Sequence, residues 1–202
     1  MKEACKIWGE LVHNRIDIEK EPVFLLVSSP DTVVSLPAER EILEDNLLAT
    51  IPRLGKEWRL TFDYKPTAIS PNGGTLLHLS AGCDNVQYGD RTPYIGHFDG
   101  KTTRLVISSA ISGDQNKHVR LTQEPPLGSW TTLEASQRLE DGVYVFRFTI
   151  GGETAWEVHN GRPEEFYGVT VWASDPWNGV PAIGFIRRLS IATNIKIGIG
   201  GS

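Results

Sequence analysis

The 202-residue sequence lacks the features that would place it in a membrane, on a nucleic acid or around a structural metal. No run of apolar residues approaches the roughly 20 that span a bilayer, so we expect no membrane insertion. Lysine and arginine form no run and the formal net charge is -5, which disfavours nucleic acid as a partner. The two cysteines have no CxxC spacing and no histidine at a metal-ligand interval, which excludes a zinc site.

Signals for the cellular compartment are also scarce. The opening residues MKEACKIWGE lack the apolar segment of a signal peptide, which fits either a cytosolic chain or one from which a signal has been removed. No Asn-x-Ser/Thr sequon is present, so glycosylation gives no guidance. Cys5 and Cys83 fit either two free thiols or one long-range disulfide, and the disulfide would suit a secreted protein.

What the sequence does contain is alternation with a period of two, from about residue 50 onward. In WRLTFDYKP (58–66), Trp, Leu, Phe and Tyr alternate with Arg, Thr, Asp and Lys, so one face of this strand is predicted to enter the core. Comparable runs recur between turn signals every 8 to 15 residues. About seven or eight strands are expected, which is typical of an all-β sandwich.

Two segments test this interpretation locally. The run DGVYVFRFTIGGETAWEVHN is predicted to be a hairpin, because Gly151 and Gly152 tolerate the positive φ of a tight turn. The segment SLPAEREILEDNLLA (35–49) is the one helical candidate, with Ser35 as a cap. The overlapping run REILEDNLLATIP fits an irregular strand equally, and that alternative is favoured. The apolar run PVFLLVS is expected to add a buried strand near the N-terminus.

The order of these segments resembles the laminin G-like and concanavalin A-like jelly-roll superfamily. The resemblance rests on LTFDYKP, TLLHLS, TRLVISS, PLGSWTTLEASQ, YVFRFTIGGETAWEV and GFIRRLSIA, and it covers roughly residues 46–194. It implies two antiparallel sheets in a module, common in extracellular proteins, that binds glycans, proteins or sterols, often beside a calcium ion. A resemblance of pattern speaks to the fold more than to the function.

Catalytic signatures are weak. A retaining glycosidase needs two carboxylates roughly 5 Å apart, whereas Glu140–Asp141, Glu164–Glu165 and Glu44–Asp45 are adjacent pairs that face opposite ways in turns. No GxSxG elbow occurs, and the five histidines are scattered singly. His78, in TLLHLS, is predicted to be an inward-facing, hydrogen-bonded side chain.

Two glycine-containing loops concentrate carboxylates that could bind calcium. Calcium takes oxygen ligands from loops with no single spacing outside the EF-hand. The alternative is that Asp, Asn and Gly are simply turn formers. The candidate calcium ligands are Asp84, Asp90, Asp99 and Asp114.

The segment VTVWASDPWNG (169–179) carries the candidate ligand-binding residues. If the valines face the core, Trp172 lies on the opposite face, where an exposed indole can stack on a sugar; the alternative is that other elements cover it. Asp175 and Pro176 are typical of a strand end, whereas Trp177 and Asn178 lie in a loop, where a large aromatic is less easily explained as core. Trp58, Trp130 and Trp156 are expected to pack within strands.

Together these observations predict an all-β, antiparallel two-sheet β-sandwich (jelly roll) of laminin G-like type. It is expected to form a single domain over residues 1–202, with a sandwich core at 46–194 and an N-terminal extension at 1–45 that adds one or two strands. The predicted function is a non-catalytic extracellular recognition or adhesion module for a glycan or protein ligand, with homo-oligomer formation as an option. The alternatives are a calcium-assisted lectin and a carbohydrate-active enzyme of the same fold.

Overall fold

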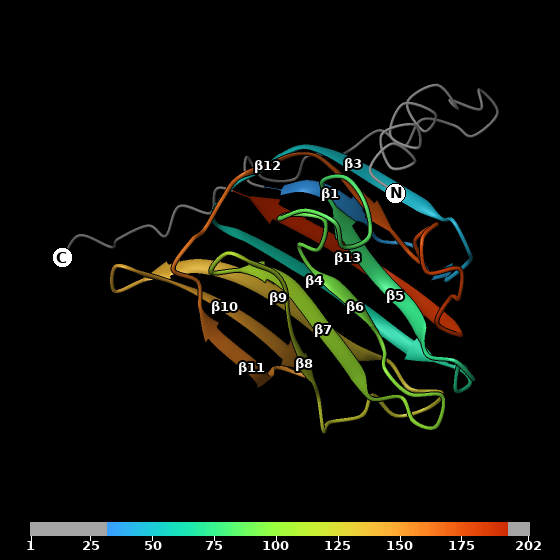
Figure 1. Ribbon diagram of the computed structural model, residues 1–202. Coiled ribbons are helices and arrows are strands. Elements are labelled where there is room, and N and C mark those ends of the chain that lie inside the picture. Colours follow the sequence, from blue (N-terminus) through green and yellow to red (C-terminus); the bar gives the residue numbers. More distant parts are fainter. Residues whose placement is uncertain (1–31, 194–202) are drawn as a thin grey trace, which may run out of the picture.

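The computed structural model describes residues 32–193, in which strands form two antiparallel sheets and no helix occurs (Figure 1). The strands are β1 (Thr32–Leu36), β2 (Arg40–Glu41), β3 (Leu47–Leu54), β4 (Trp58–Pro66), β5 (Gly74–Ser80), β6 (Tyr94–His97), β7 (Leu105–Ile111), β8 (Asp114–Arg120), β9 (Thr131–Glu140), β10 (Val143–Ile150), β11 (Glu153–His159), β12 (Phe166–Trp172) and β13 (Gly184–Thr193). No helix long and apolar enough to cross a membrane occurs among these residues.

The two sheets lie as two layers, which Figure 1 shows one in front of the other. The seven-stranded sheet has the order β1-β13-β4-β9-β10-β11, and β2 adds to β13. The six-stranded sheet has the order β3-β12-β5-β6-β7-β8. All strand pairs are antiparallel, and β1 and β2 lie in the region predicted as an N-terminal extension. The predicted antiparallel two-sheet sandwich is therefore confirmed.

The core lies between the sheets and follows the alternation in the sequence. Trp58, Leu60, Phe62 and Tyr64 of β4 are all buried, as predicted from WRLTFDYKP. Facing side chains of the six-stranded sheet complete this cluster, among them Leu79 of β5. Burial of such side chains is the main favourable contribution to folding, at about 1.5 to 3 kcal/mol for each large one.

The two local predictions have clear outcomes. β10 and β11 form the expected hairpin, and Gly151 and Gly152 adopt φ values of +61° and +89° at its turn. Residues 35–49 form no helix, and in place of one irregular strand the run REILEDNLLATIP contains β2 and the start of β3, which belong to different sheets and are separated by a turn at 44–45. Trp130 precedes β9 instead of lying within a strand, and its ring packs under Lys65 and Arg187. The predicted strand PVFLLVS lies outside the described residues.

The strand count was underestimated because short and edge strands carry little alternation. β6 has the sequence YIGH, too short to show a period, and β8 has the sequence DQNKHVR. β8 lies at the edge of the six-stranded sheet and most of its side chains are exposed, so apolar residues are not required there. Both strands nevertheless matter, because they carry part of the site described next.

Candidate functional site

The candidate site begins on the outer face of the six-stranded sheet, at His78 in the middle of β5. Leu77 and Leu79 flank it and belong to the core. Because successive side chains of a strand point to opposite faces, His78 points away from the core. The predicted inward orientation is therefore wrong, although the side chain is buried and hydrogen-bonded as expected, because loops cover this face.

A row of polar and aromatic residues crosses the outer face at this level. His78 is the cross-strand partner of Trp172 on β12 and of Tyr94 on β6, and Tyr94 is in turn the partner of Ser108 on β7. All four residues are buried. Side chains on the outer face of a sheet can be buried only where other segments of the chain cover them. Here those segments are the loop between β5 and β6 and the loop between β12 and β13.

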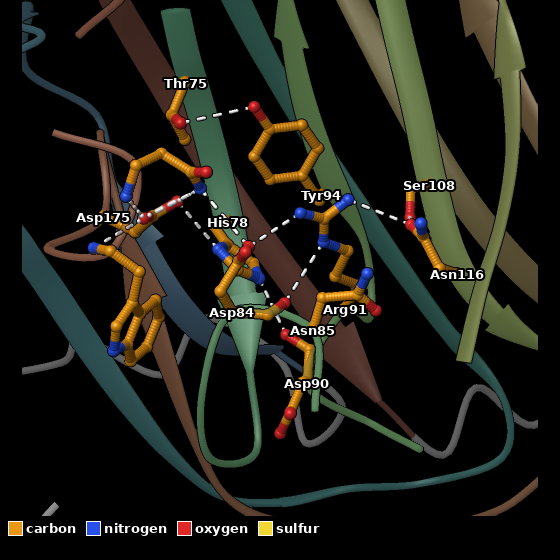
Figure 2. Close-up of polar contacts among 12 residues, drawn as sticks. Thr75, His78, Asp84, Asn85, Asp90, Arg91, Tyr94, Ser108, Asn116 and Asp175 are labelled. Carbon is orange, nitrogen blue, oxygen red and sulfur yellow. Dashed lines mark hydrogen bonds and ion pairs between the residues drawn. The ribbon is translucent and has the colours of Figure 1, made fainter. Parts of the chain in front are cut away.

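His78 is tied to both loops. Its Nδ1 lies 2.9 Å from Asp175 Oδ2, and its Nε2 lies 2.7 Å from the backbone oxygen of Asp90. A carboxylate and a carbonyl are both acceptors, so each ring nitrogen donates and the ring is positively charged. Figure 2 shows this pairing, in which the side chains of His78 and Asp175 are both 0% exposed. The result is a buried ion pair that joins a strand to a loop.

Asp175 also sets the backbone of its own loop. Its Oδ1 accepts hydrogen bonds from the backbone N–H of Trp177 at 3.0 Å and of Asn178 at 2.9 Å, which is an Asx-type turn. Burial alone would raise the pKa of Asp175, but the hydrogen bond and charge of His78 and the bonds from Asn178 lower it to about 2. The carboxylate is therefore ionised throughout the physiological range.

Arg91 organises the other loop. Its guanidinium stacks on the Tyr94 ring and donates to the backbone oxygen of Asp84 at 3.1 Å, to Asp84 Oδ1 at 2.7 Å and to Asn116 Oδ1 at 2.9 Å. The same Asn116 oxygen accepts a hydrogen bond from Ser108. Figure 2 shows how this chain of contacts links the loop to β7 and β8. Arg91 thereby fixes the position of Asp84.

The two loops meet at a partly exposed edge of this network, which we call the Trp177 rim and define as Asp84, Trp177 and Asn178. Asn178 Nδ2 lies 3.3 Å from Asp84 Oδ1 and 2.9 Å from Asp175 Oδ2. Trp177 is half-buried, and its ring makes edge contacts with His78 and Trp172. The rim thus places an indole, an amide and a carboxylate side by side.

The predicted ligand-binding residues divide into two groups. Trp177 is half-buried and Asn178 is exposed. Trp172 is only 3% exposed, and its Nε1 donates to Thr170 Oγ1 at 2.8 Å, so the alternative that other elements cover this indole is confirmed and the exposed indole is wrong. The physical reason is that Trp177 and its loop pack over it. Asp175 is buried and holds the rim from beneath.

The predicted calcium ligands are not brought together. Asp90 accepts backbone N–H groups from residues 83, 86 and 87, Asp99 bonds within residues 99–104, and Asp84 pairs with Arg91. Asp114 bonds the backbone N–H of Asn116. No group of three or more His, Cys, Asp or Glu residues in the described chain is placed to hold a metal. The four carboxylates do not fit one calcium site, and calcium binding itself stays a prediction.

Sequence reasoning missed four residues of the network: Thr75, Arg91, Tyr94 and Ser108. Tyr94 donates or accepts at Thr75 Oγ1 across 3.3 Å, and its hydroxyl group lies over Gly96, where a Cβ would come within 2.6 Å of it. The one available signal was a polar residue inside an apolar strand, as at His78. Cys83 is buried and disulfide-bonded, so the free-thiol alternative is wrong for Cys83, whereas Cys5 lies outside the described residues.

Comparisons with known proteins bear on the fold. No family model and no curated protein matches the sequence. Among solved structures, the chain is similar to the CBM40 module of the Ruminococcus gnavus IT-sialidase bound to α2,3-sialyllactose, with a TM-score of 0.53, 10% identity and coverage of 79% of this chain and 94% of that chain. It is also similar to the carbohydrate recognition domain of Emp47p, with a TM-score of 0.50, 13% identity and coverage of 83% and 99%. The predicted concanavalin A-like, jelly-roll resemblance is confirmed at the level of the fold.

Proposed function

We propose that the protein is a non-catalytic recognition or adhesion module that binds a glycan at the Trp177 rim. The observation that carries the proposal is the juxtaposition of a half-buried indole with an exposed amide and a partly exposed carboxylate. An aromatic face packs against the C–H groups of a sugar, while amide and carboxylate groups bind its hydroxyls. The rim supplies all three chemical groups within one loop junction.

The second support for the proposal is the rigidity of what lies under the rim. Trp177 and Asn178 are held by Asp175, which is held by His78, and Asp84 is held by Arg91. A binding site whose side chains are fixed before the ligand arrives loses less conformational entropy on binding. Such support is expected of a recognition surface and is unnecessary for a loop that only closes a sheet.

Asp84 of the rim and Asp175 beneath it form a carboxylate pair that an enzyme hypothesis could use, because both accept hydrogen bonds from the Asn178 amide. Asp175 is a poor catalyst in this arrangement. It is fully buried, its oxygens accept bonds from His78, Asn178 and the loop backbone, and its pKa of about 2 is opposite to the raised pKa of a general acid. This geometry favours binding over hydrolysis.

The structural neighbours are consistent with this proposal. Two of them are described as a carbohydrate-binding module and a carbohydrate recognition domain. On the same basis we propose an extracellular location for the protein. A protein ligand is the alternative, and self-association belongs to that alternative.

A glycan array, probed once with calcium and once with EDTA, tests the proposal. We expect binding to a defined set of glycans under both conditions, because the rim needs no metal to hold its shape. Loss of binding in EDTA would instead restore the calcium-assisted lectin hypothesis. Absence of binding under both conditions would contradict the proposal and favour a protein ligand.

A further inference from the structure

We infer that the Trp177 rim selects uncharged glycans and discriminates against sugars that carry a carboxylate or sulfate. This inference rests on the proposed function and adds the chemical class of the ligand. Its basis is the charge and hydrogen-bonding state of the groups at and below the rim, which leaves acceptors, but no free cation, for a ligand.

Besides the enclosed His78, Arg91 is the cation of the described network that could neutralise an acidic sugar, and three of its five N–H donors already bond within the network. Its Nε, Nη1 and Nη2 atoms each bond to an oxygen of Asp84 or Asn116. The side chain is only 14% exposed, and its face is stacked on Tyr94. An incoming anion would therefore compete with the Asp84 carboxylate for a guanidinium that is largely covered.

The accessible atoms of the rim are acceptors. The Asp84 side chain is 32% exposed, and its Oδ2 makes no hydrogen bond to any described residue, whereas Oδ1 accepts from Arg91 and Asn178. A second carboxylate, that of the exposed Glu44, lies 3.9 Å from the position that a Cβ would take on Gly179. These oxygens attract sugar hydroxyls and repel a second anion.

Arg120, an exposed guanidinium of the six-stranded sheet, is remote from the rim. Arg120 stacks on Phe98 and lies on β8, three strands away from β5. At the usual strand spacing this separation is about 14 Å, which exceeds the Debye length at physiological ionic strength. Arg120 therefore does not offset the negative charge at the rim, although an extended acidic ligand could reach it.

The experiment uses immobilised pairs of glycans that differ only in an acidic group, such as lactose with sialyllactose and glucose-terminated with glucuronate-terminated chains. For each pair that is recognised, we expect the acidic member to bind about tenfold or more weakly at physiological ionic strength. Asp84→Asn should narrow this ratio, because it removes a repulsive charge and frees donors of Arg91. Asp141→Asn, which removes the same charge at an exposed turn, is the control and should leave the ratio unchanged.

Equal or stronger binding of the acidic member would overturn the inference, while the proposed function would stand. Loss of that acidic binding in Arg120→Ala would then locate the anion on β8. An unchanged ratio in Asp84→Asn would also overturn it, because the discrimination would not originate at the rim. If none of the glycans in these pairs binds, the proposed function and this inference are both overturned.

Discussion

The outer faces of the two sheets differ in the exposure of their ion pairs. On the seven-stranded sheet, Arg147 pairs with Glu140 and Glu157, and all three side chains are about a third exposed or more. On the six-stranded sheet, His78 and Asp175 form their pair in complete burial. Exposed ion pairs contribute little to stability, whereas a buried pair costs desolvation and requires complete hydrogen bonding. The second arrangement is therefore the one that suggests a binding surface.

A second contrast concerns one buried aspartate on each face. Asp63, on the seven-stranded sheet, is compensated by Arg187 and Arg188, whose guanidinium groups reach solvent. Burial would raise its pKa, but the hydrogen bonds from Arg188 and Arg187 lower it. Asp175 is compensated by His78, which has no access to solvent. Removal of the carboxylate should therefore have different consequences on the two faces.

The largest expected effect is that of Asp175→Ala. It would leave the His78 charge buried without a partner and remove the turn that holds residues 177 and 178, so we expect a loss of about 3 to 5 kcal/mol of unfolding free energy. Urea denaturation measures the change. Asp63→Ala is the matched control, and its loss should be smaller because its arginines can turn to water. Equal losses would remove the contrast between the faces.

Acid should weaken the six-stranded sheet through His97 of β6. Burial lowers the pKa of His97 from 6.5 to about 4, and its Nε2 faces the Tyr64 hydroxyl at 3.1 Å. As the pH falls, His97 is protonated in the unfolded chain before it is protonated in the folded protein, which favours unfolding. The contribution of neutral His97 to the unfolding free energy is therefore complete above pH 6.5 and is lost as the pH falls toward 4, to a limit of about 3 kcal/mol. His97→Gln should abolish that part of the pH dependence, as measured by denaturation at several pH values.

A smaller effect separates the two tryptophans. Trp172→Phe removes the indole N–H that donates a hydrogen bond to Thr170 Oγ1. Because this bond is covered by the loop above it, we expect a loss of about 1 to 2 kcal/mol of unfolding free energy. Trp177 is half-buried, and its ring nitrogen has no hydrogen-bond partner among the described residues, so Trp177→Phe should cost less. Thermal unfolding of both variants checks the order, and a reversed order would show that the rim indole is structural.

The smallest effect is expected on the seven-stranded sheet. Glu140→Ala breaks the exposed pair with Arg147, which keeps its bond to Glu157, so the change in unfolding free energy should stay within about 1 kcal/mol. A loss as large as that of Asp175→Ala would show that burial does not distinguish the two faces.

The same contrast explains what the sequence could predict. The core of β4 and the β10–β11 hairpin follow from local rules, because alternation and a Gly-Gly turn act within a few residues. The His78–Asp175 pair spans 97 positions and the Asn178–Asp84 contact spans 94. No periodicity reports such contacts. Trp172 was predicted on the correct face, but only the packing of a separate loop determines that it is covered.

Glycan binding at the Trp177 rim can be tested by a comparison of two tryptophan variants. Trp177→Ala and Trp130→Ala each remove a half-buried indole, one at the rim and one beside the seven-stranded sheet. On a glycan array we expect Trp177→Ala to lose binding by tenfold or more, as is typical of an aromatic anchor, while it stays folded and Trp130→Ala binds as the wild type does. Unchanged binding in Trp177→Ala, or loss of binding in Trp130→Ala alone, would show that the Trp177 rim is not the glycan-binding site.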